Sequence, residues 1–506
     1  MPSYSGSQFY KDWVYAVKDD FHSSDGTPAS WAEGQPKQYG DELASVQLPS
    51  EAGSASLNAD HSLIAVGVGH DILIYNTDTE NLGQVQILKG HLSRIDALLF
   101  HPKNPNIIVS CAMNHMGGSV PAEPQIFIWD LEEQRERSLI PEDVSSNLGE
   151  YAAEMVADRL KDKDVASRQP HPWMMEQADK EVLTEAFSKA ITAQNVSSQV
   201  QHNVKLDGRL TCNFGSEVFN STGTSLAFMP GKRPASNRDD KWDVCIYDLP
   251  TQTVRLTLVG HRDAIMWTGF SPDDTYIATV CWDKTFKIWS HATGELLHTF
   301  NSDSQNWTGA FSHDSRFFAA TDGGGRFYAW DLAHGVEVVS ASVDGKSRWC
   351  RTMDWSPDDK QLVIGSGHLG QVLVYDVKRQ EAVQKRVLSK EKSAEALRRM
   401  VSGFLETSFV KYVQDEGRYG RKIVIKVPSD KGVEIYDMDE NRKWRFAPHE
   451  GVDKGWGGDV LILEKKGLIA SVDQDFLRFW VLPAKQEAVQ DTRDIATCQR
   501  VYDSLT

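Results

Sequence analysis

In the stretch CWDKTFKIW, residues 281–289, a short Asp-Lys-Thr turn separates two strand-like segments, and a tryptophan ends the second. Residues 260–300 extend it to four strand-like pieces, IMWTGF, YIATVC, TFKIW and ELLHTF. The segments SPDD, WDK and HATG separate these pieces, and they are rich in the residue types that form turns. The pattern predicts a four-stranded antiparallel meander. Such a sheet cannot bury both of its faces alone, so similar units must stack against it.

This unit resembles a WD40 repeat, a family in which a hydrogen-bonded tetrad ties each blade together internally. The resemblance places the tetrad on His261, Thr279, Asp283 and Trp289. It implies that Asp283 accepts hydrogen bonds from turn N–H groups and orients the imidazole of His261. It also implies that Thr279 bridges this imidazole to the indole N–H of Trp289. We therefore expect a structural role for the tetrad, in preference to a catalytic His/Asp pair.

The third strand of the unit ends in an aromatic residue, and this signature recurs along the chain. Four of the seven intervals between successive aromatics are 41–45 residues, which is the WD40 period. Only the unit of Trp289 carries the full tetrad. We expect an all-β WD40-type β-propeller of eight blades, with seven as the alternative, and with α-helical insertions in the longer intervals. The eight aromatics are Tyr75, Trp129, Tyr247, Trp289, Trp330, Tyr375, Tyr436 and Trp480.

The resemblance spans roughly residues 44–483 and predicts where the chain divides. The last repeat unit lacks a predicted fourth strand of its own. The segment ASVQLP, residues 44–49, is predicted to be a strand and precedes the first unit without belonging to it. Pairing the two would close the ring and remove free sheet edges. The expected segments are an N-terminal aromatic arm (1–43), blades 1–2 with the closing strand (44–131), a helical insertion (132–208), blades 3–6 (209–388), a second helical insertion (389–405), blades 7–8 (406–483) and a C-terminal tail (484–506).

The insertion at 132–208 has helical rather than strand-like periodicity. NLGEYAAEMVADRL begins with a capping box at Asn147 and Glu150. ADKEVLTEAFSKAITA continues with apolar residues at helical spacing. We expect a helical hairpin, which either packs on the propeller and buries its own apolar stripe or offers a docking surface to a partner.

Composition narrows the class of partner. The net charge of −17 and the pI of about 5.4 argue against nucleic acid as the main ligand, because duplex binding needs concentrated Lys and Arg. The chain lacks an apolar run of 18 residues, and its start lacks the features of a signal peptide. We therefore expect an intracellular protein, cytoplasmic or nuclear, that does not bind membranes. The six cysteines form no C-x-x-C pair, so we expect buried thiols and neither a metal nor a cofactor.

The propeller itself indicates a binding face at the mouth of its central channel. Aligning the first strands places Asp96, Met266, Trp307 and Arg351 at equivalent positions near this mouth. Exposed Trp and Arg contribute most often to binding energy at interfaces. The candidate partner-binding residues are Arg94, Asp96, Arg262, Met266, Trp282, Trp307, Arg348, Trp349 and Arg351.

These patterns favour a non-catalytic scaffold or adaptor that binds proteins or peptides through the propeller face and the helical insertion. No P-loop, HExxH or GxSxG motif is present in the sequence. One alternative is a propeller enzyme with its active site in the central channel, for which Asp96 and His115 are the nearby candidates. Another is a ribonucleoprotein-associated factor that works through a local basic patch near Arg418, Arg421 and Lys422. Fold alone does not decide between these functions.

Overall fold

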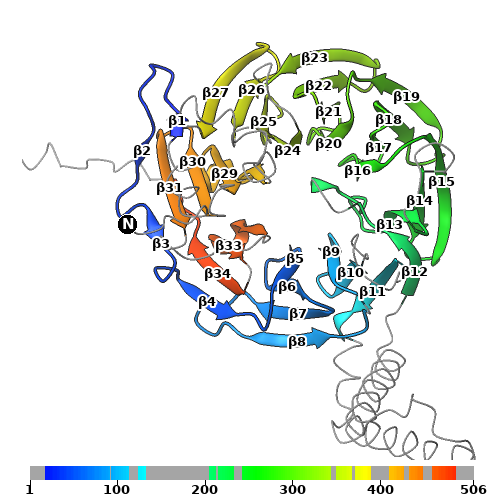
Figure 1. The fold of residues 1–506 in the computed structure, drawn as a ribbon, viewed down its shortest axis with the longest axis horizontal. Helices are drawn as coiled ribbons and strands as arrows, with labels where there is room; N and C mark the ends of the chain where they lie inside the picture. Colours follow the sequence, from blue (N-terminus) through cyan, green and yellow to red (C-terminus); the bar gives the residue numbers. More distant parts are fainter. Residues whose placement is uncertain are drawn as a thin grey trace, which may run out of the picture.

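A computed structural model describes residues 17–91, 93–112, 124–132, 204–211, 215–232, 242–343, 349–366, 371–388, 409–426, 432–447, 459–473 and 475–485. Their strands form sheets arranged in a ring (Figure 1). Strands such as β5, β9, β16 and β20 surround the centre, and β8, β15, β19 and β23 lie on the perimeter. The all-β propeller expected from the repeats is confirmed.

Four sheets have four strands each. They contain β5 (Ala52–Leu57), β6 (Leu63–Val68), β7 (Asp71–Asn76) and β8 (Gln84–Leu88); β16 (Ile265–Phe270), β17 (Tyr276–Cys281), β18 (Thr285–Ser290) and β19 (Leu296–Asn301); β20 (Asn306–Phe311), β21 (Phe317–Asp322), β22 (Arg326–Asp331) and β23 (Val336–Ser342); and β32 (Val460–Leu463), β33 (Leu468–Val472), β34 (Phe476–Val481) and β4 (Ala44–Gln47). The β16–β19 sheet is the antiparallel meander predicted from residues 260–300.

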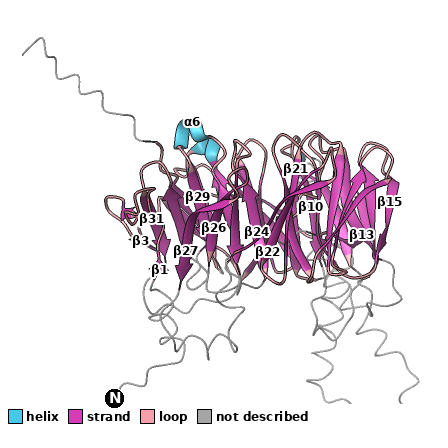
Figure 2. Ribbon diagram, turned by 90° about the horizontal axis from the view of Figure 1, so that it is seen from above, coloured by secondary structure: helices cyan, strands magenta, loops and turns pink. Residues whose placement is uncertain are grey.

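Two further sheets gain strands at their outer edge. One contains β24 (Cys350–Trp355), β25 (Gln361–Ser366), β26 (Val372–Asp376), β27 (Glu381–Leu388) and β1 (Val17–Asp19). The other contains β28 (Val410–Tyr412), β29 (Lys422–Lys426), β30 (Val433–Asp437), β31 (Arg442–Ala447), β2 (Ser30–Trp31) and β3 (Lys37–Gln38). The described helical turns are α6 (Glu416–Tyr419) and η3 (Glu464–Lys466). Figure 2 shows α6 on one face of the ring.

The remaining sheet has seven strands because β12 pairs with strands from two repeat units. It contains β9 (Ile95–Phe100), β10 (Ile107–Ala112), β11 (Gln125–Asp130), β12 (Val204–Arg209), β13 (Ser225–Pro230), β14 (Trp242–Asp248) and β15 (Thr253–His261). At the crossover, a Cβ on Gly208 would lie 2.6 Å from the Met229 carbonyl oxygen, so glycine permits the close pairing. The eight anchor aromatics lie on β7, β11, β14, β18, β22, β26, β30 and β34. The number of blades stays a prediction.

The boundary of the large insertion needs a correction. Residues 204–208, assigned to the helical insertion from the sequence, belong to β12. Val204 and Leu206 are half-buried and alternate with exposed Lys205 and Asp207, which is the period of a strand. The rest of the predicted insertion, residues 133–203, lies outside the described residues, as do 389–405 and most of the predicted tail. The other domain boundaries stay predictions.

The N-terminal strap, residues 17–47, follows the outer edge of three sheets. β1 pairs antiparallel with β27, and β2 and β3 pair parallel with β31. The strap ends in β4, which pairs with β34 as the fourth strand of the last sheet. Backbone groups at these edges are thereby paired rather than left open.

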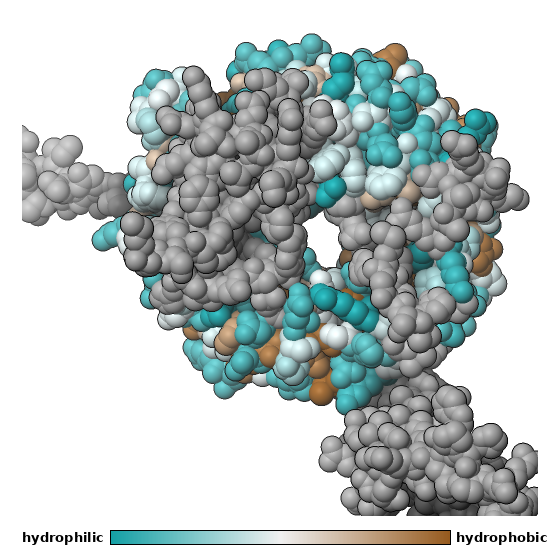
Figure 3. All heavy atoms as spheres, in the orientation of Figure 1, coloured by the Kyte–Doolittle hydropathy of each residue, from teal (hydrophilic) through white to brown (hydrophobic). Residues whose placement is uncertain are grey.

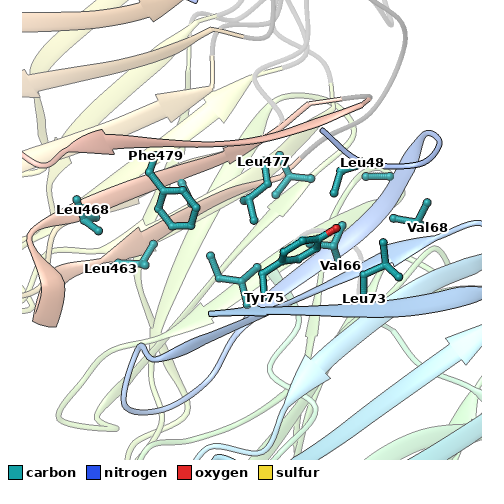
Figure 4. Close-up of a cluster of buried hydrophobic side chains, with 13 residues drawn as sticks. Leu48, Val66, Val68, Leu73, Tyr75, Leu463, Leu468, Leu477 and Phe479 are labelled. Atoms are coloured by element: carbon teal, nitrogen blue, oxygen red, sulfur yellow. The ribbon is translucent and has the colours of Figure 1, made fainter. Parts of the chain in front are cut away.

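Buried apolar side chains lie between neighbouring sheets rather than in one central core. Figure 4 shows the cluster between the first and last repeat units, where Val66 and Tyr75 meet Leu477 and Phe479. Burying a side chain such as Leu or Phe contributes about 1.5–3 kcal/mol relative to exposure. Packing of sheet on sheet therefore holds the ring together, and it leaves the loops at both faces available for other roles.

Candidate functional site

The four tetrad residues form one hydrogen-bonded chain across the β16–β19 sheet. His261 Nδ1 lies 2.8 Å from Asp283 Oδ2, and His261 Nε2 lies 2.7 Å from Thr279 Oγ1. Trp289 Nε1 donates to the same hydroxyl oxygen at 3.0 Å. The backbone N–H of Arg262 also donates to Asp283 Oδ2, at 3.0 Å. These hydrogen bonds join the end of β15 and the loop that follows it to the interior of the β16–β19 sheet.

The protonation states in the tetrad follow from its surroundings. Burial lowers the pKa of His261 below its usual value of 6.5, so its imidazole is neutral at pH 7. Burial alone would raise the pKa of Asp283, but hydrogen bonds from His261 and Thr285 hold it below its usual range. An ionised carboxylate can only accept, so Nδ1–H donates to Asp283 and Nε2 accepts from the Thr279 hydroxyl. Every polar group of the four is thus satisfied within the protein.

A metal at the tetrad would have to replace these bonds. Within the described residues, one group of side chains has metal-ligand spacing, and it consists of His261, Cys281 and Asp283, whose ligand atoms lie within 4.8 Å of one another. Both ring nitrogens of His261 are already engaged, and Cys281 Sγ donates to the Asp263 carbonyl at 3.1 Å. Burial also raises the pKa of the Cys281 thiol, which disfavours the thiolate that binds metals. The geometry is that of a structural tetrad.

Partial versions of the tetrad's hydrogen-bond network occur in two other repeat units, where the sequence did not predict them. Ser110 Oγ lies 2.6 Å from His91 Nε2 and accepts from Trp129 Nε1 at 2.8 Å. Ser471 Oγ accepts from Trp480 Nε1 at 3.2 Å. Searching for Ser as well as Thr on the second strand would have found both. A hydroxyl group that accepts a hydrogen bond from the indole N–H of the third-strand tryptophan is therefore found in more repeat units than the one with the full tetrad.

Three indoles and one guanidinium gather where the inner strands begin, and we call them the mouth cluster (Trp282, Trp307, Trp349 and Arg351). Trp307 and Arg351 are the second residues of β20 and β24, and Trp282 lies in the turn between β17 and β18. The guanidinium carbon of Arg351 is 4.1 Å from the Trp307 ring centre and 5.4 Å from that of Trp349. The Trp282 and Trp307 rings meet edge to face at 5.3 Å. Three consecutive sheets thus contribute to one cluster.

The backbone around the mouth cluster positions the indoles. Trp349 has φ of 57°, a left-handed conformation that is uncommon for a bulky residue. Its N–H donates to the Gly323 carbonyl at 3.4 Å, so the glycine turn before β22 fixes its position. A Cβ on Gly323 would lie 3.0 Å from Trp307 Nε1, and glycine therefore lets the indole lie close to this turn. Strained residues of this kind often occur at functional sites.

The other predicted mouth residues have different surroundings. Arg94 is exposed and its guanidinium lies 3.7 Å from the Glu51 carboxylate, while Asp96 is half-buried on β9. Arg262 is exposed in the loop before β16, and Met266 packs against the apolar cluster behind that strand. Arg348 and His115 lie outside the described residues. Figure 3 shows the opening through the ring that these inner strands surround.

A charged pair on the inner strands was not predicted from the sequence. Lys411 Nζ donates to Asp354 Oδ1 at 3.2 Å, and the Tyr412 N–H donates to Asp354 Oδ2 at 2.9 Å. The Asp354 carboxylate raises the pKa of Lys411, with a smaller contribution from Glu217. These residues lie on separate repeat units, so no local pattern could have joined them. The pair connects β24 to β28, and Asp354 lies three residues after Arg351 along β24.

Known proteins match this chain over parts of its length. The family profile described as "WD domain, G-beta repeat" matches residues 252–290. A ribosome biogenesis protein WDR12 homolog of Anopheles gambiae is 27% identical over 133 residues, which is 26% of this chain and 31% of that protein. A periodic tryptophan protein 2 homolog of Mus musculus is 24% identical over 230 residues, covering 41% of this chain and 24% of that protein. The chain therefore spans less than a third of either relative.

The solved structure of Saccharomyces cerevisiae Sqt1 has a similar fold, with a TM-score of 0.56 at 10% identity. The similarity covers 87% of this chain and 99% of that one. The fold is that of a WD40-type propeller, and the repeat matched at residues 252–290 contains all four residues of the tetrad. In the described part of the chain, no helix has the length and apolar character needed to cross a bilayer.

Proposed function

We propose that this protein is a non-catalytic scaffold that binds an extended segment of a partner protein at the mouth cluster. The observation that carries the proposal is the convergence of Trp307, Trp349 and Arg351 at one end of the ring. Trp and Arg are the residues that most often dominate binding energy at interfaces. Trp349 and Arg351 are half-buried, so both are packed in place and remain accessible to a partner.

The relatives support this proposal in general terms. Their names refer to ribosome biogenesis and, for an Arabidopsis thaliana protein 27% identical over 148 residues, to pre-mRNA processing. By analogy, the partners of this chain belong to ribonucleoprotein assemblies, and the protein acts in the nucleus or the cytoplasm. Its net charge of −17 favours contact with the proteins of such assemblies over direct binding of nucleic acid.

The helical insertion is the second docking element of the proposal. Its sequence predicts two amphipathic helices, and β12 returns the chain to the ring directly after it. A segment that leaves and re-enters the ring at neighbouring strands can be replaced without changing the paired strands. Residues 133–203 are therefore the correct limits for a replacement by a short Gly/Ser loop.

The test is affinity purification from native extract with quantitative mass spectrometry. Four baits are compared, namely the full chain, Trp349→Ala, the 133–203 replacement and Arg418→Ala. The last is the matched control, because Arg418 also stacks on an aromatic ring, Tyr419 at 5.1 Å, but on α6 at the opposite face. Circular dichroism and denaturation must first show that each bait is folded.

We expect a stoichiometric partner that the Arg418→Ala bait retains and the Trp349→Ala bait loses. Loss with the 133–203 replacement as well would show that both elements dock the same partner. A partner kept by both the Trp349→Ala and the 133–203 baits would contradict both docking elements. The absence of any stoichiometric partner would contradict the scaffold function itself.

A further inference from the structure

We infer that the outer edge of β8 binds an extended segment of a partner protein, which adds to the first sheet as a further strand. The segment carries apolar side chains at alternate positions and no charged residue among them. This site is separate from the mouth cluster, so the inference goes beyond the proposed function and does not depend on it.

The outer edge of β8 is open. β8 is the last strand of its sheet, and within the described residues it pairs with β7 alone. The backbone groups on its outer side therefore have no strand to pair with, as in any edge strand. Val85 and Ile87 are each 43% exposed, whereas Gln86 and Leu88 are buried. The strand thus combines an unpaired backbone edge with two exposed apolar side chains on one face.

Three other outermost strands carry residues that protect an edge. Charged side chains on an edge strand discourage another strand from adding to it. β15 has Arg255, whose guanidinium donates to the carbonyls of His291 and Ala292, and β23 has Glu337. β19 has His298. β8, with the sequence QVQIL, has neither a charged residue nor a histidine, so nothing in the strand itself opposes pairing.

The exposed side chains of β8 lie at the rim of an apolar cluster. Ile87 is opposite Leu73, which belongs to the buried cluster between the first and last repeat units. Across this cluster, Val46 is partly buried, and Val481, on the same face of β34 as Phe479, is 55% exposed. Figure 3 shows apolar side chains at the rim of the ring over β7 and β8. A strand added outside β8 would place every second side chain beside apolar surface, which favours apolar residues there.

The ring already binds extended strands at the outer edges that precede β8. The strap adds β1 to β27, β2 and β3 to β31, and β4 to β34. In β4, partly buried Ala44 and Val46 alternate with exposed residues, and the strand contains no charge. β8 is the next outer edge around the ring after β4 (Figure 1). The pattern that the last sheet accepts from β4 is therefore the pattern that the edge of β8 fits.

The size of the edge decides between a peptide segment and a second copy of this chain. The perimeter of the ring is convex (Figure 1), so two copies that paired through β8 would touch along little more than this strand. Its five residues span about 17 Å. Such a contact buries far less than the roughly 1,200 Å² of a stable protein interface. A flexible segment pairs its main chain along the whole edge and continues beyond it, so it fits this edge better than another ring does.

The experiment selects peptides on the full-length protein. A displayed library of random, unmodified 12-residue peptides is panned on immobilised wild type, and the pool is then depleted on Ile87→Lys protein. We expect the peptides that need Ile87 to share alternating apolar residues without Asp, Glu, Lys or Arg among them. Val85→Lys should weaken their binding at least about 10-fold, because the added strand would cover the charge. Val254→Lys, at a 49% exposed position on β15, is the matched control and should bind them like wild type.

Two measurements show whether binding adds a strand. N-methylation of single peptide amides should weaken binding about 10-fold at every second position and little between them, because alternate N–H groups point toward β8. Hydrogen exchange on the wild-type protein should slow at β8, and not at β15, when the peptide is added. The exchange measurement uses no variant, so it tests the site even if a lysine substitution disturbs folding.

Defined results would overturn the inference. Peptides that need Ile87 but show no alternation, or no period of two in N-methylation, would exclude an added strand. The absence of any peptide that needs Ile87 or protects β8 would exclude the site. A wild-type dimer in sedimentation that Ile87→Lys dissociates would assign the edge to a second copy. Protection of β8 by a synthetic peptide of residues 486–506 would assign it to this chain's own C-terminal segment.

Discussion

At the residue scale, Thr279 is where the hydrogen bonds of the tetrad converge. It is fully buried and bridges His261 Nε2 to Trp289 Nε1. Replacing it by valine keeps the shape but leaves both nitrogens buried without a partner. An unsatisfied buried group costs about 1–3 kcal/mol, so we expect Thr279→Val to lower the free energy of unfolding by about 2 kcal/mol or more. Urea denaturation measures this loss.

Thr257→Val is the matched control for Thr279→Val, because Thr257 is exposed on the edge strand β15. The control should change stability by less than about 0.5 kcal/mol. Equal effects of the two substitutions would show that the tetrad bridge contributes nothing specific.

The buried imidazole of His261 makes part of the stability depend on pH. Because its pKa in the folded state lies below the usual 6.5, the unfolded chain takes up a proton first as the pH falls. The contribution is therefore complete above pH 6.5 and decreases below it, by up to about 1.4 kcal/mol at pH 5.5. We expect the stability advantage of wild type over His261→Gln to shrink by about this amount between pH 7.5 and 5.5.

Denaturation curves of both proteins at the two pH values test this expectation. Asp283 does not contribute in this window, since its lowered pKa keeps it ionised in both states. An advantage that stays constant, or grows as the pH falls, would mean that the imidazole is already protonated in the folded protein.

Local spacing predicts tetrad residues but not the mouth cluster as a unit. The distances along the chain among His261, Thr279 and Trp289 lie within one repeat, so one sequence pattern places all three. Alignment also identified Trp307 and Arg351 as neighbours of the mouth. It could not show that the Arg351 guanidinium lies near the rings of both Trp307 and Trp349, because this depends on how adjacent sheets are rotated. The left-handed backbone of Trp349 has no signal in the sequence.

At the scale of elements, the N-terminal strap depends on one buried aromatic. Phe21 is fully buried and stacks on Tyr436, with ring centres 4.1 Å apart. We expect Phe21→Ala to lower the free energy of unfolding by about 3–5 kcal/mol or to release the strap locally. Hydrogen exchange at β2 and β3 distinguishes these results, because local release removes protection there alone.

Trp31→Ala is the control for the strap, since Trp31 lies in the same segment but is 43% exposed beside Lys443. It should leave both stability and exchange nearly unchanged. Full protection of β2 and β3 in Phe21→Ala would contradict anchoring by this ring.

At the scale of the whole molecule, closure of the ring depends on β4. Val46 packs against the apolar cluster between the first and last repeat units, and it lies opposite Leu477. An aspartate there would place a charge against this cluster, so we expect Val46→Asp to cost at least about 2 kcal/mol. Gln47→Asp, one residue on and exposed on the other face of β4, should cost little.

Guanidinium denaturation followed by tryptophan fluorescence compares the two variants. A loss confined to Val46→Asp would show that closure by β4 supports the entire ring. Equal midpoints for both variants would mean that the ring is stable without this closing contact.

The sequence by itself determined the meander, its repetition along the chain, the tetrad residues and the closing strand. These features follow from alternation and spacing within about forty residues, where side-chain direction is fixed by the strand period. The tertiary structure alone decided the strap across three sheets, the sharing of β12 by two repeat units and the contact of Arg351 with Trp307 and Trp349. Each of these joins residues of different repeat units, whose relative positions are set by sheet packing and not by local pattern.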